Sequence, residues 1–206
     1  FETSCEERFN SMLIGGEGII LVSGPTGSGK TTTLYSTLNK LESPDVNIVT
    51  VEDPIEYDLD NINQAQINMK SGVTFASALR SILRQDPDII MVGEIRDKET
   101  ADIAVQSSLT GHLVLSTIHT NDACSVFPRL SDIGVEPYMV AATIQGVEAQ
   151  RLVRKLCHKC AKRVERPAFL KKNTLKGRWF EPVGCDECQG KGYDGRIGIY
   201  EMVAVT

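Results

Sequence analysis

The sequence predicts an α/β fold, in which a mainly parallel β-sheet is covered by helices on both faces, together with a small zinc-binding subdomain. Three observations predict it. Short apolar runs alternate with segments of helical periodicity along most of the chain, which is typical of a parallel sheet with crossover helices. A glycine-rich turn joins the first apolar run to the first periodic segment. Four of the six cysteines form two C-x-x-C pairs toward the C-terminus.

The first half of the sheet is predicted from three apolar segments. Residues 18–23, GIILVS, form a short apolar run that suits a buried parallel strand. Leucines recur on one side of the helix expected over residues 30–40. A second strand over residues 47–51 is stopped by the sequence EDP, and residues 62–67 alternate in polarity like an edge strand.

The second half repeats the alternation. Thr74 is expected to cap a helix over residues 74–84, and Asp97 one that runs to Leu109. Between and after these helices the sequence predicts further elements: strands over residues 89–92 and 113–116, helices around residues 122–132 and from residue 137, and a strand over residues 196–205 that returns to a sheet edge.

Composition divides the chain unevenly. We expect an α/β core over residues 1–152, a cysteine module over residues 153–196 and a returning strand over residues 197–206. Residues 151–178 hold 11 of the 22 basic residues but only one of the 27 acidic ones. The acidic remainder argues against a protein that binds duplex DNA. The basic stretch suits a membrane surface, an acidic partner or RNA, or is simply a solvated loop.

Nothing in the sequence predicts secretion or membrane insertion. No apolar run approaches the roughly 20 residues that a membrane-spanning helix needs. The N-terminal segment lacks the features of a signal peptide and has no initiator Met, so we expect a fragment of a longer protein.

A phosphate-binding loop is the most specific local pattern. The sequence GPTGSGKT matches G-x-x-x-x-G-K-[ST], and it lies between a predicted strand and a predicted helix. Glycines let backbone N–H groups turn toward an anion, and the N-terminal end of the helix carries positive charge. Lys30 is expected to reach the β- and γ-phosphates, and Thr31 to bind Mg²⁺. The predicted nucleotide-binding residues are Gly24, Pro25, Thr26, Gly27, Ser28, Gly29, Lys30, Thr31 and Thr32.

Acidic residues follow two of the predicted strands. Glu94 follows residues 89–92 after one glycine, Gly93, at a place where a carboxylate can orient water or join the Mg²⁺ shell. Glu52, Asp53 and Glu56 follow residues 47–51, and strand C-termini in such sheets meet at the ligand crevice. The alternative is that some of these acids are helix caps or surface loop residues.

Two histidines bracket one predicted strand. His112 and His119 lie on either side of LVLST. At least one is expected at the ligand edge of the sheet, where it would sense the γ-phosphate, and either alone could be a structural histidine.

Four arginines are candidates for charge stabilisation. Arg80 and Arg84 are four apart and share a helix face, while Arg96 and Arg129 lie near predicted element ends. Guanidinium groups stabilise a transferring phosphoryl group, often across a subunit boundary. A solvated helix face is the alternative.

The paired cysteines favour a metal site over disulfides. Cys157 and Cys160 are separated by 24 residues from Cys185 and Cys188. Two such pairs can hold one tetrahedral Zn²⁺ in a closed, structural site. The alternatives are four free thiols, or His158 as a competing ligand. The pattern C-x-x-C-x-G-x-G also occurs in DnaJ-type zinc modules, which repeat it, whereas this chain has it once.

Taken in order, these motifs resemble a known family. GPTGSGKTTTLY, TVEDPIEY, LRQDPDIIMVGEIRD and TGHLVLSTIHTNDA resemble the Walker A, Asp box, Walker B and His box of bacterial type II secretion and type IV pilus assembly ATPases. The cysteine pairs followed by GKGYDGRIGIYE resemble the zinc module of the same family. The resemblance runs through nearly the whole chain.

The resemblance implies a RecA-like P-loop core and an ATP-hydrolysing motor that uses ATP, Mg²⁺ and Zn²⁺. It implies that Glu94 is the Walker B glutamate, that Glu52, Asp53 and Glu56 form the Asp box, and that the two histidines belong to the His box. It also matches the four arginines with family arginines implicated in activity or in subunit contacts.

The same resemblance implies a setting. Full-length members work as homo-hexamers at the cytoplasmic face of the inner membrane, where they act on a platform protein and on the cytoplasmic domain of another membrane protein. Family members carry N-terminal domains that help bind nucleotide, so we expect this chain alone to be largely monomeric with low turnover. We also expect Arg163, Arg166, Lys171 and Lys172 to face anionic phospholipid or an acidic platform protein.

Three rival functions remain at this point. A pilus retraction ATPase shares the core, although retraction relatives typically lack the tetracysteine insert. A non-hydrolysing docking module would use ATP and zinc only for stability. A nucleic-acid motor is disfavoured by the acidic body and by the lack of an aromatic stripe for base stacking. The sequence does not distinguish secretion from pilus assembly.

Overall fold

The computed structural model describes residues 3–166 and 177–205, and it divides into two compact units. Unit 1 comprises Phe1–Arg151 with Tyr200–Thr206, and unit 2 comprises Leu152–Ile199. Strands β6 and β9 each begin in one unit and end in the other.

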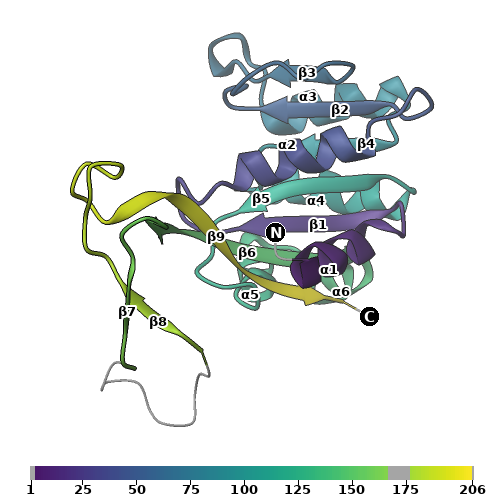
Figure 1. Ribbon diagram of the computed structural model, residues 1–206. Coiled ribbons are helices and arrows are strands. Elements are labelled where there is room, and N and C mark those ends of the chain that lie inside the picture. The colour runs from purple at the N-terminus through teal and green to yellow at the C-terminus, as the bar shows by residue number, and fades with distance from the viewer. Residues whose placement is uncertain (1–2, 167–176, 206) are drawn as a thin grey trace. The chain divides into compact units, whose positions relative to one another are not determined.

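Unit 1 is built on a single sheet with the strand order β3-β2-β4-β5-β1-β6-β9 (Figure 1). All strand pairs from β3 through β6 are parallel. This confirms the predicted fold class. The strands are β1 (Gly18–Ser23), β2 (Ile48–Glu52), β3 (Asn63–Gln66), β4 (Ile89–Val92), β5 (Leu113–Ile118), β6 (Ile144–Leu156) and β9 (Tyr193–Ala204).

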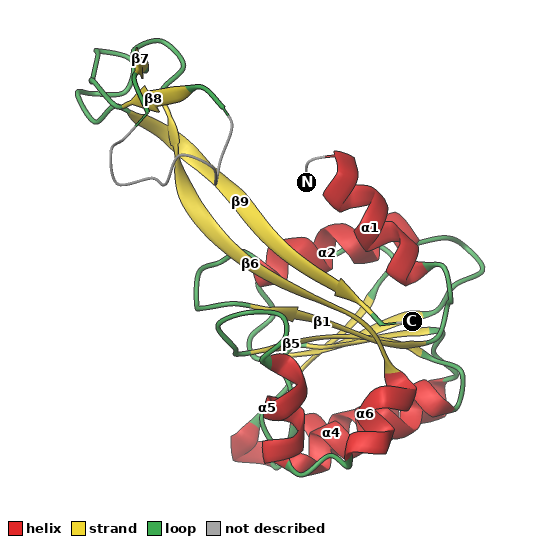
Figure 2. Cartoon of the chain, turned by 90° about the horizontal axis from the view of Figure 1, so that it is seen from below, coloured by secondary structure: helices red, strands yellow, loops and turns green. Residues whose placement is uncertain are grey.

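Helices cover both faces of this sheet (Figure 2). One face carries α1 (Thr3–Leu13) and α2 (Lys30–Leu41). The other carries α3 (Phe75–Ile82), α4 (Lys98–Leu109), α5 (Val126–Ile133) and α6 (Pro137–Thr143). Short 3-10 turns over Met69–Ser71 and Leu83–Gln85 flank α3.

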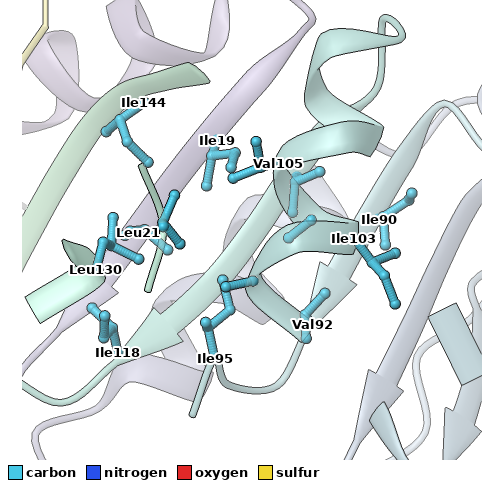
Figure 3. Packing of buried hydrophobic residues seen from close by; sticks show 14 of the residues in the cluster. Ile19, Leu21, Ile90, Val92, Ile95, Ile103, Val105, Ile118, Leu130 and Ile144 are labelled. Carbon is cyan, nitrogen blue, oxygen red and sulfur yellow. The ribbon is translucent and has the colours of Figure 1, made fainter. Parts of the chain in front are cut away.

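Two hydrophobic clusters lie on the two faces of the sheet. Along β1, Ile19 and Leu21 join the cluster under α3 to α6 (Figure 3), while Ile20 and Val22 join the cluster under α1 and α2. Every residue of β1 is therefore buried, because successive side chains point to opposite faces and both faces are covered. This explains the unbroken apolar run in the sequence.

The predicted helix caps agree with the structure. Thr74 and Ser77 form a capping box at α3, and Asp97 accepts a hydrogen bond from the Thr100 N–H (2.8 Å) at α4. The helix expected from residue 122 begins only at Val126, because the Asp122 carboxylate bonds the N–H and the hydroxyl of Ser125 and holds a turn there. Helix α1 and strand β6 were not predicted.

The described residues of unit 2 include the end of β6, the beginning of β9 and one further pair of short strands. Its strands β7 (Lys162–Val164) and β8 (Trp179–Glu181) pair antiparallel. The Arg154 guanidinium lies over the Tyr193 ring at 3.9 Å. Across the described residues of both units, every helix is too short or too polar to pass through a lipid bilayer.

Candidate nucleotide and metal sites

The predicted phosphate-binding loop connects the carboxyl end of β1 to α2. Gly24, Gly27 and Gly29 all have positive φ angles (138°, 76° and 92°), which L side chains rarely adopt. A Cβ atom at Gly24 would also overlap the carbonyl oxygen of Gln150. Gly29 occupies the N-cap of α2 and has no side chain to satisfy the first N–H groups of the helix. These N–H groups are therefore available to an anion.

Lys30 folds back over this loop. Its Nζ donates hydrogen bonds to the carbonyl oxygens of Gly24 (2.9 Å) and Pro25 (3.1 Å). Burial lowers the pKa of Lys30, and the negative charge of Glu94 opposes that shift. The carboxylate therefore acts electrostatically on the loop lysine.

Glu94 follows β4 and is only 11% exposed. Its Oε2 forms an ion pair with Arg96 Nε and lies 3.8 Å from His119 Nε2. The same oxygen is buried without a well-directed hydrogen bond, so it keeps acceptor capacity for a further donor. His119 itself is about half exposed, at the end of β5.

Close backbone and hydroxyl contacts fix these strand ends to one another. The Gly93 N–H bonds the Val51 carbonyl (2.8 Å), and the Thr117 hydroxyl bonds the Gly93 carbonyl (2.6 Å). Ser23, the last residue of β1, shares a hydrogen bond of 2.5 Å with the Thr120 hydroxyl. The carboxyl ends of β2, β4, β5 and β1 therefore meet at one edge of the sheet.

The three acids of the predicted Asp box differ in environment. Glu52 is buried and accepts hydrogen bonds from Tyr35 Oη, Thr50 Oγ1 (2.6 Å) and Gln64 Nε2 (3.0 Å). Burial, together with the bond to Glu52, raises the pKa of Tyr35. Glu52 therefore ties β2 to α2 and has little room for a ligand, whereas Asp53 and Glu56 are exposed at the same edge.

Two of the predicted site residues, His112 and Arg84, lie at the opposite edge of the sheet. His112 precedes β5, and its carbonyl bonds the Gly18 N–H at the start of β1 (3.1 Å). The strand between the two histidines separates them by roughly 20 Å. Arg84 lies beside Gln85, whose carbonyl accepts a bond from Asn47 before β2. Both therefore occupy the amino edge of the sheet, and His119 is the histidine at the carboxyl edge, where the ligand site was expected.

The predicted arginines Arg80, Arg84 and Arg129 differ in their surroundings. Arg80 forms an exposed ion pair with Glu99 of α4 (2.7 Å), and Arg84 bonds the Arg80 carbonyl (2.8 Å). Arg80 and Arg84 therefore do not point at a common ligand, although they were expected to share a helix face. Arg129 is exposed on α5.

Gln150 of β6 is a loop contact that the sequence did not reveal. Its Nε2 donates to the Ser28 carbonyl (2.5 Å), and its Oε1 accepts from the Thr33 hydroxyl (2.8 Å). It is 3% exposed. The segment VEAQRLV has no periodicity that singles it out; only the parallel pairing of β6 with β1 brings it to the loop.

A groove lies between α1 and α2. It has a volume of about 330 Å³ and includes Phe9, Thr33, Thr37 and Tyr200 in its lining. Thr32, predicted to bind nucleotide, is exposed at this groove.

The four predicted zinc ligands come together in unit 2. Their sulfur atoms all lie within 4.8 Å of one another, with separations of 3.9 Å for Cys157–Cys185 and 3.8 Å for Cys160–Cys188. A tetrahedral ion with Zn–S bonds of about 2.3 Å requires sulfur separations of about 3.8 Å. The donor set therefore fits a tetrahedral metal ion. His158 is exposed and is not part of this group.

Backbone N–H groups point at these sulfurs. Gly184 donates to Cys160 Sγ (3.3 Å), and Cys185 and Gly192 donate to Cys188 Sγ (3.2 and 3.1 Å). Burial alone would raise the pKa of Cys188, but these two backbone hydrogen bonds and the contacts with the Cys185 and Cys160 thiols together outweigh it and lower the pKa. Burial raises the pKa of Cys160. Such N–H···S bonds are suited to stabilising thiolates, which are the form that binds metal.

Comparison with known proteins identifies the family. The model of the type II/IV secretion system protein family matches residues 1–206. The chain belongs to this family. Among curated type II/IV secretion relatives, it is 59% identical over 188 residues to the type II secretion system protein HxcR of Pseudomonas aeruginosa, covering 91% of this chain and 38% of the relative. It is 49% identical over 206 residues to the type IV pilus assembly ATPase PilB of Thermus thermophilus, covering 97% and 23%.

Solved structures of secretion and pilus ATPases share the fold. The pilus retraction motor PilT with bound ADP aligns with a TM-score of 0.69 and 31% identity, over 96% of this chain and 50% of that one. The chain spans less than two fifths of the length of both curated relatives above.

Proposed function

We propose that this chain is the ATP-hydrolysing domain of a motor that drives type II secretion or type IV pilus assembly. The observation that carries the proposal is the meeting of a P-loop with Glu94 and His119 at one sheet edge, in a chain of the type II/IV secretion system family. In the complete protein, the motor would work as a hexamer on a platform protein at the cytoplasmic face of the inner membrane.

ATP would bind with its phosphates in the loop. The glycine conformations and the free N-terminal end of α2 suit the β-phosphate. Lys30 would exchange its bonds to the loop carbonyls for phosphate oxygens, which offer it negative charge. The Thr31 hydroxyl would hold Mg²⁺, which would offset the negative charge of the phosphates.

Hydrolysis would depend on Glu94. Its buried oxygen has spare acceptor capacity and would orient the attacking water or accept its proton. His119 would report the γ-phosphate, since it lies beside Glu94, and Arg96 would hold the Glu94 carboxylate in place. Asp53 and Glu56 are the exposed Asp-box acids for water or Mg²⁺, while Glu52 supports them through Tyr35.

The four cysteines would hold one structural Zn²⁺. The sulfur separations and the N–H···S bonds support this assignment, and four protein ligands would leave no open position for catalysis. Arg163 and Arg166 of the predicted lipid-facing set belong to this unit, and Lys171 and Lys172 lie outside the described residues. Anionic lipid or an acidic partner is the proposed target of this charge.

Assembly or secretion is favoured over retraction. The chain is 59% and 49% identical to a secretion and an assembly relative, but 31% identical to the retraction motor. The tetracysteine cluster supports the same choice.

Phosphate release by the full-length protein tests the proposed function. In Lys30→Ala, the loop loses its phosphate-binding charge, so we expect hydrolysis to fall by at least about 100-fold, with a weaker affinity for ATP. In Glu94→Gln, the water loses its base while the size of the side chain is kept. Hydrolysis should fall by about 100-fold or more, but ATP should still bind.

Control variants separate the alternatives. Lys159→Ala removes an exposed lysine that pairs with Glu187 in unit 2 and should hydrolyse ATP normally. A wild-type hexamer that binds ATP but releases no phosphate would instead favour a docking module. Normal turnover in Glu94→Gln would overturn the role assigned to Glu94.

A further inference from the structure

Gln150 connects β6 to both ends of the phosphate loop. Its backbone carbonyl leaves no room for a side chain at Gly24, where the loop begins. Its side-chain amide holds the Ser28 carbonyl near the loop's end and the Thr33 hydroxyl in the first turn of α2. One buried residue thus contacts the start of the loop, its end and the helix that follows.

The bond to Ser28 fixes the direction of one peptide group. In a planar trans peptide, the C=O of one residue and the N–H of the next point in opposite directions. Because the Ser28 carbonyl is held toward β6, the Gly29 N–H must point away from β6. A loop that binds phosphate needs its N–H groups turned inward and its carbonyls outward. The hydrogen bond from Gln150 therefore sets one of these groups in the binding orientation.

The amide is the functional group that this position requires. A backbone carbonyl only accepts hydrogen bonds, so Gln150 must donate to Ser28 through Nε2. Its Oε1 then accepts from the Thr33 hydroxyl, which fixes the amide plane. Methionine matches the length of glutamine but lacks the donor, and glutamate in its ionised form has only acceptors.

We infer that Gln150 is a positioning residue of the nucleotide site, holding the Ser28–Gly29 peptide with its N–H toward the β-phosphate. The inference rests on the proposed function, because it assumes that the loop binds ATP. Gln150 itself lies outside the loop and acts through Ser28. The loss of Gln150 should therefore weaken the binding of ATP equally in the ground state and in the transition state.

Calorimetric titration of the chain with Mg-ATP tests this inference. Without the bond to Ser28, the peptide is free to turn, and in Gln150→Met we expect the Kd for ATP to rise about tenfold, the effect of one lost hydrogen bond. Thr33→Val keeps the hydrogen bond from Gln150 to Ser28 but removes the one that fixes the plane of the Gln150 amide. The Kd of this variant for ATP should rise about threefold. In the full-length protein, Gln150→Met should raise KM for ATP while kcat changes by less than about twofold.

Thr143→Val is the matched control. Thr143 is buried in α6 and donates a hydroxyl bond to the Met139 carbonyl (2.8 Å), so its loss destabilises the fold without touching the loop. Its Kd for ATP should equal that of the wild type. Circular dichroism at the titration temperature verifies that each variant is folded.

The outcomes distinguish a failure of this inference from a failure of the proposed function. Failure of the folded wild-type chain and of the full-length protein to bind ATP would contradict the proposed function. A wild type that binds, with a folded Gln150→Met that binds equally well, would overturn the role of Gln150. If Gln150→Met does not fold, an unchanged Kd in Thr33→Val overturns it instead.

Discussion

Two buried glutamates, Glu52 on β2 and Glu148 on β6, have opposite surroundings. Three donors surround the Glu52 carboxylate. Both Glu148 oxygens are buried without a hydrogen-bond partner. Burial raises the pKa of Glu148 to about 8, and its charge contributes to the raised pKa of Tyr200, after burial itself. An acid in the interior is tolerated only when it is hydrogen-bonded or neutral.

Glu148 should make the stability of the protein depend on pH. The unfolded chain releases this proton near pH 4.5 and the folded chain near pH 8, so the folded state holds it more tightly. Between these values, the free energy of unfolding should fall by about 1.4 kcal/mol per pH unit from this group. The loss is complete above about pH 8.

Glu148→Gln removes the ionisable group. We expect the variant to show a shallower decline of Tm between pH 5 and pH 9 and to be the more stable protein at pH 9. Thermal melts of both proteins across this range provide the measurement. Parallel curves would show that Glu148 is not buried as a neutral acid.

At the scale of elements, close packing decides where α1 lies. The buried side chains of α1, Phe9, Met12 and Leu13, form part of the cluster under α1 and α2. Met12 packs directly over Gly146 of β6, where a Cβ atom would lie 2.8 Å from the Met12 Cγ and closer still to its sulfur. The i, i+3, i+4 spacing of these residues is a helical signal that the sequence contains. The partner strand has no such signal.

Gly146→Ala should push α1 off the sheet. Overpacking of this kind typically costs about 1 to 3 kcal/mol, so urea denaturation should show a lower midpoint. Gly15→Ala is the control, since a Cβ there meets only one oxygen, at 3.8 Å. On a Met12→Ala background, the additional cost of Gly146→Ala should largely vanish, and an equal cost on both backgrounds would refute the contact.

At the scale of the whole molecule, the two units are stabilised in different ways. Unit 1 has a cluster of apolar side chains on each face of its sheet. Among the described residues of unit 2, the buried residues of apolar type are only Cys157 and Cys188. A segment this poor in core depends on a metal or a comparable cross-link.

Chelation should therefore unfold unit 2 selectively. We expect about one zinc per chain from metal analysis of protein purified under reducing conditions without chelator. After treatment with a strong chelator, hydrogen exchange should accelerate around Cys157 and Cys188, while β1 and β5 stay protected. Cys185→Ser should reproduce this pattern without chelator. Unchanged exchange in the metal-free protein would contradict a structural zinc.

The sequence by itself determined the parallel α/β fold, the loop around Lys30, and the pairing of the four cysteines. Each of these features depends on residues that are close together in the chain, because the periodicity of apolar residues, the positions of the glycines and the C-x-x-C spacing follow from short-range geometry. Only the tertiary structure decided that His119 and not His112 lies beside Glu94, that Glu52 is held by α2, and that Gln150 holds the loop. Those relations depend on strand order and direction, and residues far apart in the chain become neighbours only when the sheet is assembled.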